Sequence, residues 1–154
     1  MNSPDFSIVE ATWRDLPDLR RLEQQAFGRD AWPLIDLIGV VTLPGVVRLK
    51  AVESNDQMLG FIAGDIDSKN QIGWVTTIAV FPEQRRRGVA SALLAAGESR
   101  MGTPRVRLSV RRSNREAIHL YENRDYHLVD VWNHYYADGE DALVMEKKAY
   151  EILS

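Results

Sequence analysis

A short basic turn between two apolar runs carries the clearest chemical signal in this sequence. Residues 78–90 read IAVFPEQRRRGVA, a pattern that predicts a strand, a loop and an alanine-rich helix beginning near Gly88. The N-terminus of a helix presents free backbone N–H groups and therefore binds anions. Arg85, Arg86 and Arg87 add positive charge, and Gly88 would let a phosphate approach the backbone closely. The turn is predicted to bind a pyrophosphate, with a solvated basic loop as the alternative.

Composition limits the other chemistry that the chain can perform. The 154 residues include no cysteine, which excludes disulfides, thiolate metal sites and a cysteine nucleophile. No spacing of Ser, His and Asp suggests another nucleophile, and no metal site is expected. The formal net charge of −3 gives no general reason to expect nucleic acid or an acidic membrane as a partner.

Length and hydropathy predict one domain covering residues 1–154. Residues 1–11 lack the basic and apolar regions of a signal peptide. The most apolar stretch, residues 33–47, is interrupted by Asp36 and Pro44 and is too short to span a bilayer. We therefore expect no membrane segment and a cytoplasmic location.

Hydrophobic periodicity and turn residues predict alternating strands and helices. Strands are expected at residues 6–11, 46–53, 58–66, 72–80, 106–110, 128–136 and 142–146. Helices are expected at residues 15–27, 33–41, 87–101 and 114–124. Asp15 is the expected N-cap of the first helix. The order β-α-α-β-β-β-α-β-α-β-β predicts an α/β (α+β) fold, with a mixed, mostly antiparallel seven-stranded sheet and helices on both faces.

Three motifs occur in an order that is similar to the GNAT superfamily of N-acetyltransferases. The pattern Arg85-x-x-Gly88-x-Ala90 resembles the coenzyme A signature of that superfamily. Residues 108–122, LSVRRSNREAIHLYE, resemble its strand, Ser-Asn turn and helix with Ala-Ile-x-Leu-Tyr. Residues 135–145, YYADGEDALVM, resemble the C-terminal hairpin of the ribosomal-protein-alanine N-acetyltransferases and of archaeal protein N-terminal acetyltransferases.

The resemblance implies acetyl-CoA as co-substrate and assigns it a set of residues. The pantetheine arm would pair like an added strand with the edge formed by Ile78, Ala79 and Val80. Asn114 would hold the coenzyme with its side chain, although it is equally well placed as a helix N-cap. The pyrophosphate would bind chiefly to backbone N–H groups, with the arginine side chains as rim charges, in a turn made of Arg86, Arg87, Gly88, Val89, Ala90 and Ser91.

Tyr121 occupies the position where the family places a tyrosine beside the thioester sulfur. Attack of an amine on the acetyl carbon expels a thiolate, which needs a proton. A phenol with an ordinary pKa of about 10 can supply that proton as a general acid. The resemblance therefore favours an acid role for Tyr121 over that of a core tyrosine.

Two positions depart from the family pattern. Ser109 stands where the resembled subfamily often carries a Glu or His that acts as general base, so no base carries over, and Ser109 could at most hold a water. Asp125 stands where the family usually has Gly, and it is expected in a left-handed conformation at some cost in stability. Other residues that could serve as the base are His134, Glu140, Asp141, Asp30 and Glu23.

These features predict direct acetyl transfer from acetyl-CoA to a primary amine, most simply the α-amine of a protein N-terminus. A protein α-amine has a pKa of about 7.7–8.0 and a lysine about 10.4, so the α-amine loses its proton with roughly 3.4 kcal/mol less work. An enzyme without a dedicated base would therefore favour the α-amine. The alternatives are a small-molecule amine, such as a polyamine or amino acid, and an acyl-CoA-binding sensor that has lost its base.

Overall fold

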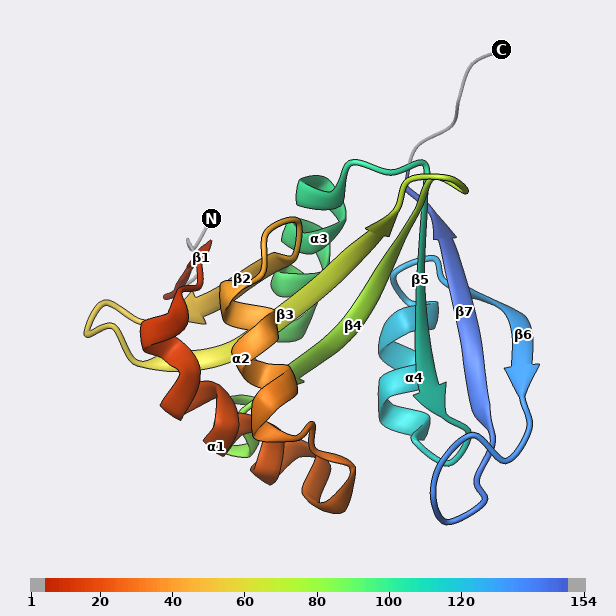
Figure 1. Ribbon diagram of the computed structural model, residues 1–154, viewed down its shortest axis with the longest axis horizontal. Helices are drawn as coiled ribbons and strands as arrows, with labels where there is room; N and C mark the ends of the chain where they lie inside the picture. Colours follow the sequence, from red (N-terminus) through yellow and green to blue (C-terminus); the bar gives the residue numbers. More distant parts are fainter. Residues whose placement is uncertain (1–4, 150–154) are drawn as a thin grey trace. The chain divides into compact units, whose positions relative to one another are not determined.

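A computed structural model describes residues 5–149 of the chain. Its seven strands form one sheet in the order β1-β2-β3-β4-β5-β7-β6 (Figure 1). The strands are β1 Ser7–Glu10, β2 Val47–Val52, β3 Met58–Asp67, β4 Ile72–Val80, β5 Arg105–Arg111, β6 His127–Trp132 and β7 Ala142–Lys148. The helices are α1 Leu16–Phe27, α2 Leu34–Thr42, α3 Val89–Met101 and α4 Arg115–Glu122. The expected seven-stranded mixed sheet is confirmed.

The pairing of the strands is antiparallel for β1–β2, β2–β3, β5–β7 and β6–β7, and parallel for β4–β5. The parallel register is short, because it joins only Ile72–Trp74 to Arg105–Arg107. In contrast, β5 pairs with β7 along its whole length, from Arg105 to Arg111. The pairing of β4 with β5 therefore ends at Trp74, well before β4 ends at Val80.

Several element boundaries differ from those expected. Strand β6 ends at Trp132 instead of residue 136, and α4 ends at Glu122. Asp15 precedes α1 but makes no capping hydrogen bond to it. Instead, Thr12 and Asp15 form a capping box around the short 3-10 turn at Trp13–Asp15, and Asp15 also accepts a 2.7 Å hydrogen bond from Lys50 Nζ. Asp15 is thus at the predicted N-cap position of α1, but its side chain is used by the preceding turn and by Lys50 instead of by the helix.

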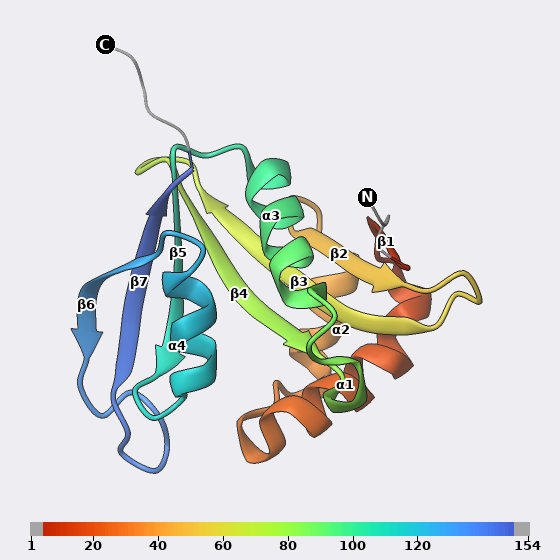
Figure 2. The same ribbon diagram turned by 180° about the vertical axis from the view of Figure 1, so that it is seen from behind.

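The described residues divide into two compact units. The first comprises the residues up to Asp65 together with Thr76–Met101, and the second comprises Ile66–Val75 together with the residues from Gly102 onward. In the first unit, α1 and α2 cover one face of the strands and α3 covers the other, as the two opposite views show (Figures 1 and 2). In the second unit, α4 lies beside β5 and β7 (Figure 2).

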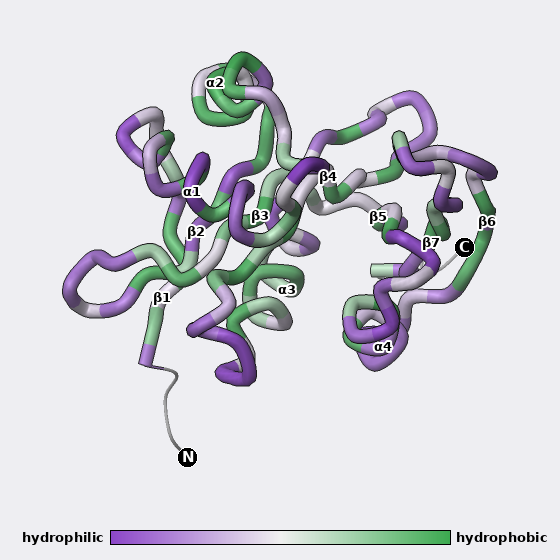
Figure 3. Tube along the Cα trace, turned by 90° about the horizontal axis from the view of Figure 1, so that it is seen from below, coloured by the Kyte–Doolittle hydropathy of each residue, from purple (hydrophilic) through white to green (hydrophobic). Residues whose placement is uncertain are grey.

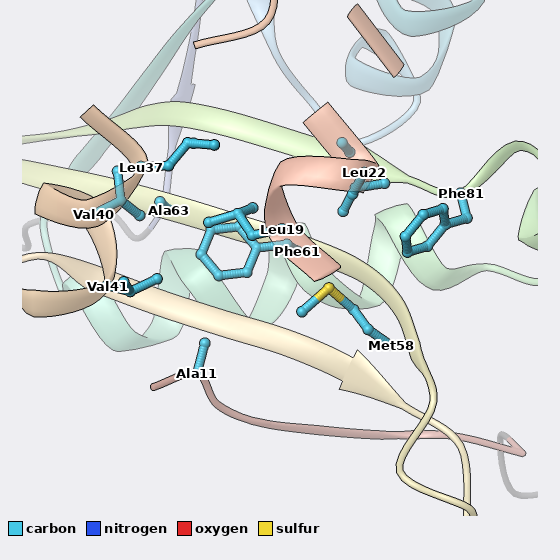
Figure 4. Close-up of a cluster of buried hydrophobic side chains, with 11 residues drawn as sticks. Ala11, Leu19, Leu22, Leu37, Val40, Val41, Met58, Phe61, Ala63 and Phe81 are labelled. Atoms are coloured by element: carbon cyan, nitrogen blue, oxygen red, sulfur yellow. The ribbon is translucent and has the colours of Figure 1, made fainter. Parts of the chain in front are cut away.

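The core of the first unit is a cluster of buried apolar side chains (Figure 4). Leu19 and Leu22 of α1 and Leu37 of α2 meet Phe61 of β3, and all four are at most 1% exposed. Most of helix α2 is hydrophobic (Figure 3), and its outer side leaves Ile35 73% exposed. The inner face of α2 thus belongs to the core, while its outer face meets solvent in this chain.

Gly60 lies where β3 and β4 approach each other closely. A Cβ at this position would lie 2.8 Å from the carbonyl oxygen of Ala79 and 3.0 Å from Leu93 of α3. Both the strand and the helix are held in place by the core, so they cannot move away cheaply. This glycine therefore sets how closely β4 can approach β3 just before the basic turn.

We predict that Gly60→Ala lowers the free energy of unfolding by about 1–3 kcal/mol, because the added methyl group collides with backbone. Gly97→Ala in α3 is the matched control: its Cβ would lie 2.8 Å from the terminal Cδ1 of the Ile62 side chain and 3.7 Å from its Cγ atoms, and Ala gains up to about 1 kcal/mol over Gly in a helix. Urea unfolding of both variants measures the difference. Equal stability of the two variants would contradict the proposed backbone contact.

Candidate active site

The turn that follows β4 is built by local hydrogen bonds. The N–H of Phe81 donates to Leu59 O of β3 at 3.0 Å, and the N–H of Gln84 donates to Phe81 O at 2.8 Å. A short 3-10 turn covers Pro82–Gln84. Arg86 and Gly88 then take left-handed conformations, with φ of 66° and 78°. These two left-handed residues redirect the chain from the strand into α3.

The first turn of α3 presents backbone N–H groups to open space. The first intrahelical bond runs from Ala92 N–H to Gly88 O at 3.0 Å, so the N–H groups of residues 88–91 have no acceptor within the helix. A Cβ built on Gly88 would meet no atom within 4 Å. The buried side chain of Val89, 2% exposed, fixes the helix start to the core. The arrangement suits an anion that approaches the backbone at Gly88.

The three arginines of the turn have different environments. Arg85 and Arg86 are exposed, whereas Arg87 is partly buried. The guanidinium of Arg87 is 2.6 Å from a carboxylate oxygen of Glu53 and donates to the Gln84 side chain at 2.5 Å. Arg87 therefore ties the turn to the β2–β3 loop, and its main contribution to an anion site is its backbone.

The edge of β4 that faces away from β3 provides a second part of the site. Within the described chain, no strand pairs with this edge beyond Trp74. Ala79 is buried, at 8% exposure, while Ile78 and Val80 are half-buried. Their backbone groups on this edge can accept an extended ligand that carries amides, in the manner of an added strand.

Tyr121 lies in the second unit, on α4, and is 7% exposed. Its ring packs edge-on against Tyr126, with ring centroids 5.9 Å apart. Burial raises the pKa of Tyr121 to about 12, and the nearby Tyr136 adds a smaller increase. The phenol is therefore protonated at neutral pH, which a hydrogen-bond donor must be.

Ser109 lies on β5 of the second unit, and Asn114 is the N-cap residue of the helix α4 that follows. The side chain of Asn114 caps α4 by accepting a 3.2 Å hydrogen bond from Ala117 N–H. That capping role does not occupy its amide N–H₂ group. Ser109 is half-buried on β5 and pairs with Val144 of β7. The capping function expected of Asn114 is present.

Three of the candidate bases are engaged in holding the loop between β6 and β7. Glu140 accepts hydrogen bonds from Arg111 at 2.7 Å and from Ser113 N–H at 2.7 Å, and these contacts lower its pKa. Asp141 accepts from His134 N–H at 3.0 Å. The ring Nδ1 of His134 lies 3.0 Å from Gly139 O. These side chains brace the loop.

Glu23, another of the candidate bases, lies far from the β6–β7 loop in sequence and has different contacts. It lies on α1 in the first unit and is 1% exposed. One carboxylate oxygen accepts a 2.6 Å hydrogen bond from the hydroxyl of Thr77 on β4, and the other is buried without a hydrogen-bond partner. Asp30, the remaining candidate, is half-buried in the segment that follows α1.

Sequence reasoning missed a continuous aromatic surface in the second unit. Trp74 stacks on Trp132 at 5.9 Å, Trp132 contacts Tyr135 at 5.2 Å, and Tyr135 contacts Tyr136 at 5.1 Å. Arg111 lies 4.1 Å from the centroid of the Tyr136 ring. Tyr135 is 56% exposed. The clustering of aromatic residues at positions 132–136 was the available signal.

Comparison with known proteins identifies the class of protein that carries these features. Residues 8–126 match the acetyltransferase (GNAT) family. The chain is 44% identical to an N-alpha-acetyltransferase of Saccharolobus solfataricus, with 93% of each chain covered. It is 36% identical to the N-terminal acetyltransferase A complex catalytic subunit NAA10 of Arabidopsis thaliana, over 63% of this chain and 54% of that one. The chain therefore spans about half the length of that plant relative.

Solved structures confirm the fold. The ribosomal-protein-S18-alanine N-acetyltransferase of Escherichia coli superposes with a TM-score of 0.85 at 24% identity, covering 97% of both chains. Ard1 of Thermoplasma volcanium also gives a TM-score of 0.85 at 24% identity, covering 96% of this chain and 99% of that one. The chain belongs to the acetyltransferase (GNAT) family and is an N-acetyltransferase.

Two further findings concern residues 5–149 only. None of the helices in this range is long and apolar enough to cross a membrane. Within the same range, no group of three or more His, Asp or Glu side chains is arranged to hold a metal ion.

The pKa of Tyr121 predicts a specific loss of stability at alkaline pH. The folded protein holds the phenolic proton up to about pH 12, whereas an ordinary tyrosine loses it near 10. Unfolding therefore releases a proton between these values, and stability must fall as pH rises through this window, by roughly 3 kcal/mol at most. Tyr121→Phe should remove this component, while the exposed Tyr135→Phe should not. Urea unfolding between about pH 9 and 11 measures it, and parallel curves for parent and Tyr121→Phe would contradict it.

Proposed function

We propose that this N-acetyltransferase transfers an acetyl group from acetyl-CoA directly to the α-amine of a protein N-terminus. The similarity to the Saccharolobus solfataricus N-alpha-acetyltransferase, at 44% identity over 93% of both chains, carries the choice of acceptor. We also propose that residues 1–154 act as one acetyltransferase domain, because the family match begins in the first unit and ends in the second. The cytoplasmic location stays a prediction.

The turn after β4 supports a nucleotide-bearing donor. The pyrophosphate would be bound by the N–H groups at the start of α3, with Arg86, Gly88 and Ser91 around it and Arg87 supplying backbone. The pantetheine arm would lie along the unpaired edge of β4 at residues 78–80, where its two amides can pair with backbone. Asn114 would contact the coenzyme from α4.

The transfer itself needs no covalent enzyme intermediate. The amine attacks the thioester carbon, the C–N bond forms, and the C–S bond breaks as the thiolate leaves. Tyr121 would stabilise that sulfur. Because a thiol has a pKa near 8.5, complete proton transfer from a phenol of pKa about 12 is uphill by roughly 5 kcal/mol. We therefore expect Tyr121 to act mainly as a hydrogen-bond donor to the sulfur while the C–S bond breaks.

The coenzyme assignment predicts the effect of bulk at Gly88. Gly88→Ala and Gly88→Trp place the same strain on a backbone with φ of 78°, but only the indole fills the space in front of the N–H groups. Gly88→Trp should weaken acetyl-CoA binding by at least tenfold relative to Gly88→Ala, about 1.4 kcal/mol. Isothermal calorimetry measures both affinities, with circular dichroism as the control for folding. Equal affinities of the two variants would refute the assignment.

The acceptor is tested with matched peptides. A peptide with a free N-terminus and no lysine should be acetylated, and the same peptide with a blocked N-terminus and one lysine should react far more slowly, because the lysine amine is mostly protonated. The chain has no cysteine, so a thiol reagent reports released CoA without background, and mass spectrometry locates the acetyl group. If the lysine peptide or a polyamine is acetylated faster than the peptide with a free N-terminus, the proposed acceptor is wrong. If acetyl-CoA binds but no CoA is released with any amine tested, the chain would instead be an acyl-CoA-binding protein.

A further inference from the structure

Glu23 is buried in the first unit with half of its carboxylate unsatisfied. It is 1% exposed, and its Oε2 is the only buried carboxylate oxygen in the described residues that has no hydrogen-bond partner. Buried polar groups are nearly always paired, so an unpaired carboxylate oxygen needs an explanation. A glutamine would fill the same space and accept the same bond from Thr77 without a buried charge. Packing alone therefore does not account for a carboxylate here.

The surroundings of Glu23 connect it to the proposed acetyl site. Thr77 donates its hydroxyl hydrogen to Oε1 at 2.6 Å, and it immediately precedes Ile78 on β4, where the proposed pantetheine edge begins. The backbone of Trp32, in the segment between α1 and α2, also contacts the carboxyl group. Glu23, Thr77 and Trp32 all belong to the first unit, so this juxtaposition lies within one compact body.

The environment of Glu23 increases the proton affinity of its carboxylate. Burial raises the pKa of Glu23, while the Thr77 hydroxyl and the Trp32 backbone lower it by smaller amounts. No charged group is among these causes. A carboxylate with a raised pKa holds an accepted proton more firmly than an exposed one does, which favours its use as a base.

We propose that Glu23 is the general base of this enzyme and receives the proton of the attacking amine through the hydroxyl of Thr77. As the C–N bond forms, the amine proton moves to Thr77 Oγ1, directly or through one water, and the hydroxyl hydrogen of Thr77 moves to Glu23 Oε1. The C–S bond then breaks and the thiolate takes up a proton from solvent, so that amine and thioester become amide and thiol. Glu23 later returns its proton to solvent. This inference rests on the proposed acetyl transfer to an amine.

The direction of the observed hydrogen bond agrees with this relay. Thr77 donates to Glu23, so the lone pairs of its oxygen can accept a hydrogen bond from an amine or a water that reaches this residue, which is 6% exposed. The relay also explains how a chain with Ser109 at the family's base position could remove a proton. Three of the other candidate bases, His134, Glu140 and Asp141, are occupied in bracing the β6–β7 loop.

The test uses Glu23→Gln in the full chain, with a free N-terminal peptide as acceptor. In the parent, log(kcat/KM) should rise with a slope of two at low pH, because both Glu23 and the amine must lose a proton. Glu23→Gln should reduce this slope to one and lower kcat by about 10²-fold or more, with acetyl-CoA affinity unchanged. Glu98→Gln is the matched control, since Glu98 is also buried, at 8% exposure, but lies in the C-terminal half of α3.

A pair of substitutions at Thr77 keeps the proposal testable if Glu23→Gln does not fold. Thr77→Ser retains the hydroxyl and should keep the parental slope and rate, whereas Thr77→Val retains the shape and should lose both. If the parent is active and Glu23→Gln or Thr77→Val keeps the slope of two in log(kcat/KM) against pH, the relay is wrong, while the proposed function still stands. A parent that acetylates no amine would instead refute the proposed function itself.

Discussion

The incomplete pairing of β4 is the constraint from which the site follows. An interior strand normally satisfies its backbone on both edges, because an unpaired buried N–H or C=O costs free energy comparable to a lost hydrogen bond. Here β4 pairs with β5 over Ile72–Trp74 only, although Ala79 further along the strand is buried. A ligand with backbone-like amides can restore what the missing strand would have supplied. The fold thus gives up sheet hydrogen bonds, and in the proposed function the edge left unpaired would bind an extended ligand with amides.

The basic turn is kept rigid by contacts that do not involve its anion-binding groups. The ion pair of Arg87 with Glu53 and the close approach of Gly60 to Ala79 hold the turn from two sides. A site that is already in place loses little conformational entropy when its ligand binds. In the proposed site the arginines would therefore have different roles: the Arg87 guanidinium holds the turn through Glu53, and backbone N–H groups would supply the directed donors.

Local sequence patterns were sufficient for the elements and insufficient for the proton chemistry. The strand before Pro82, the glycine at the helix start and the left-handed Asp125, with φ of 71°, follow from residue types that act on their own backbone. The missing side-chain cap at Asp15 also has a local cause, since Thr12 and Asp15 already form a capping box around the preceding turn. The contact between Glu23 and Thr77 joins residues 54 apart in sequence. No periodicity reveals such a pair before the fold is known, although the place of Glu23 four residues after Leu19, on the apolar stripe of α1, was a sign that it would be buried.

Burial raises the pKa of both Tyr121 and Glu23. A raised pKa suits Tyr121 as a hydrogen-bond donor and Glu23 as a proton acceptor, which are opposite roles. For Glu23 the sign of the linkage is unfavourable: the folded state prefers the protonated carboxyl, so the protein loses stability as pH rises through the raised pKa. A chain selected for stability alone would replace this carboxyl by a neutral side chain. Its retention beneath the strand that would bind the acetyl donor is the kind of cost that active sites carry for function, and it separates Glu23 from the loop carboxylates, whose ion pairs serve the fold.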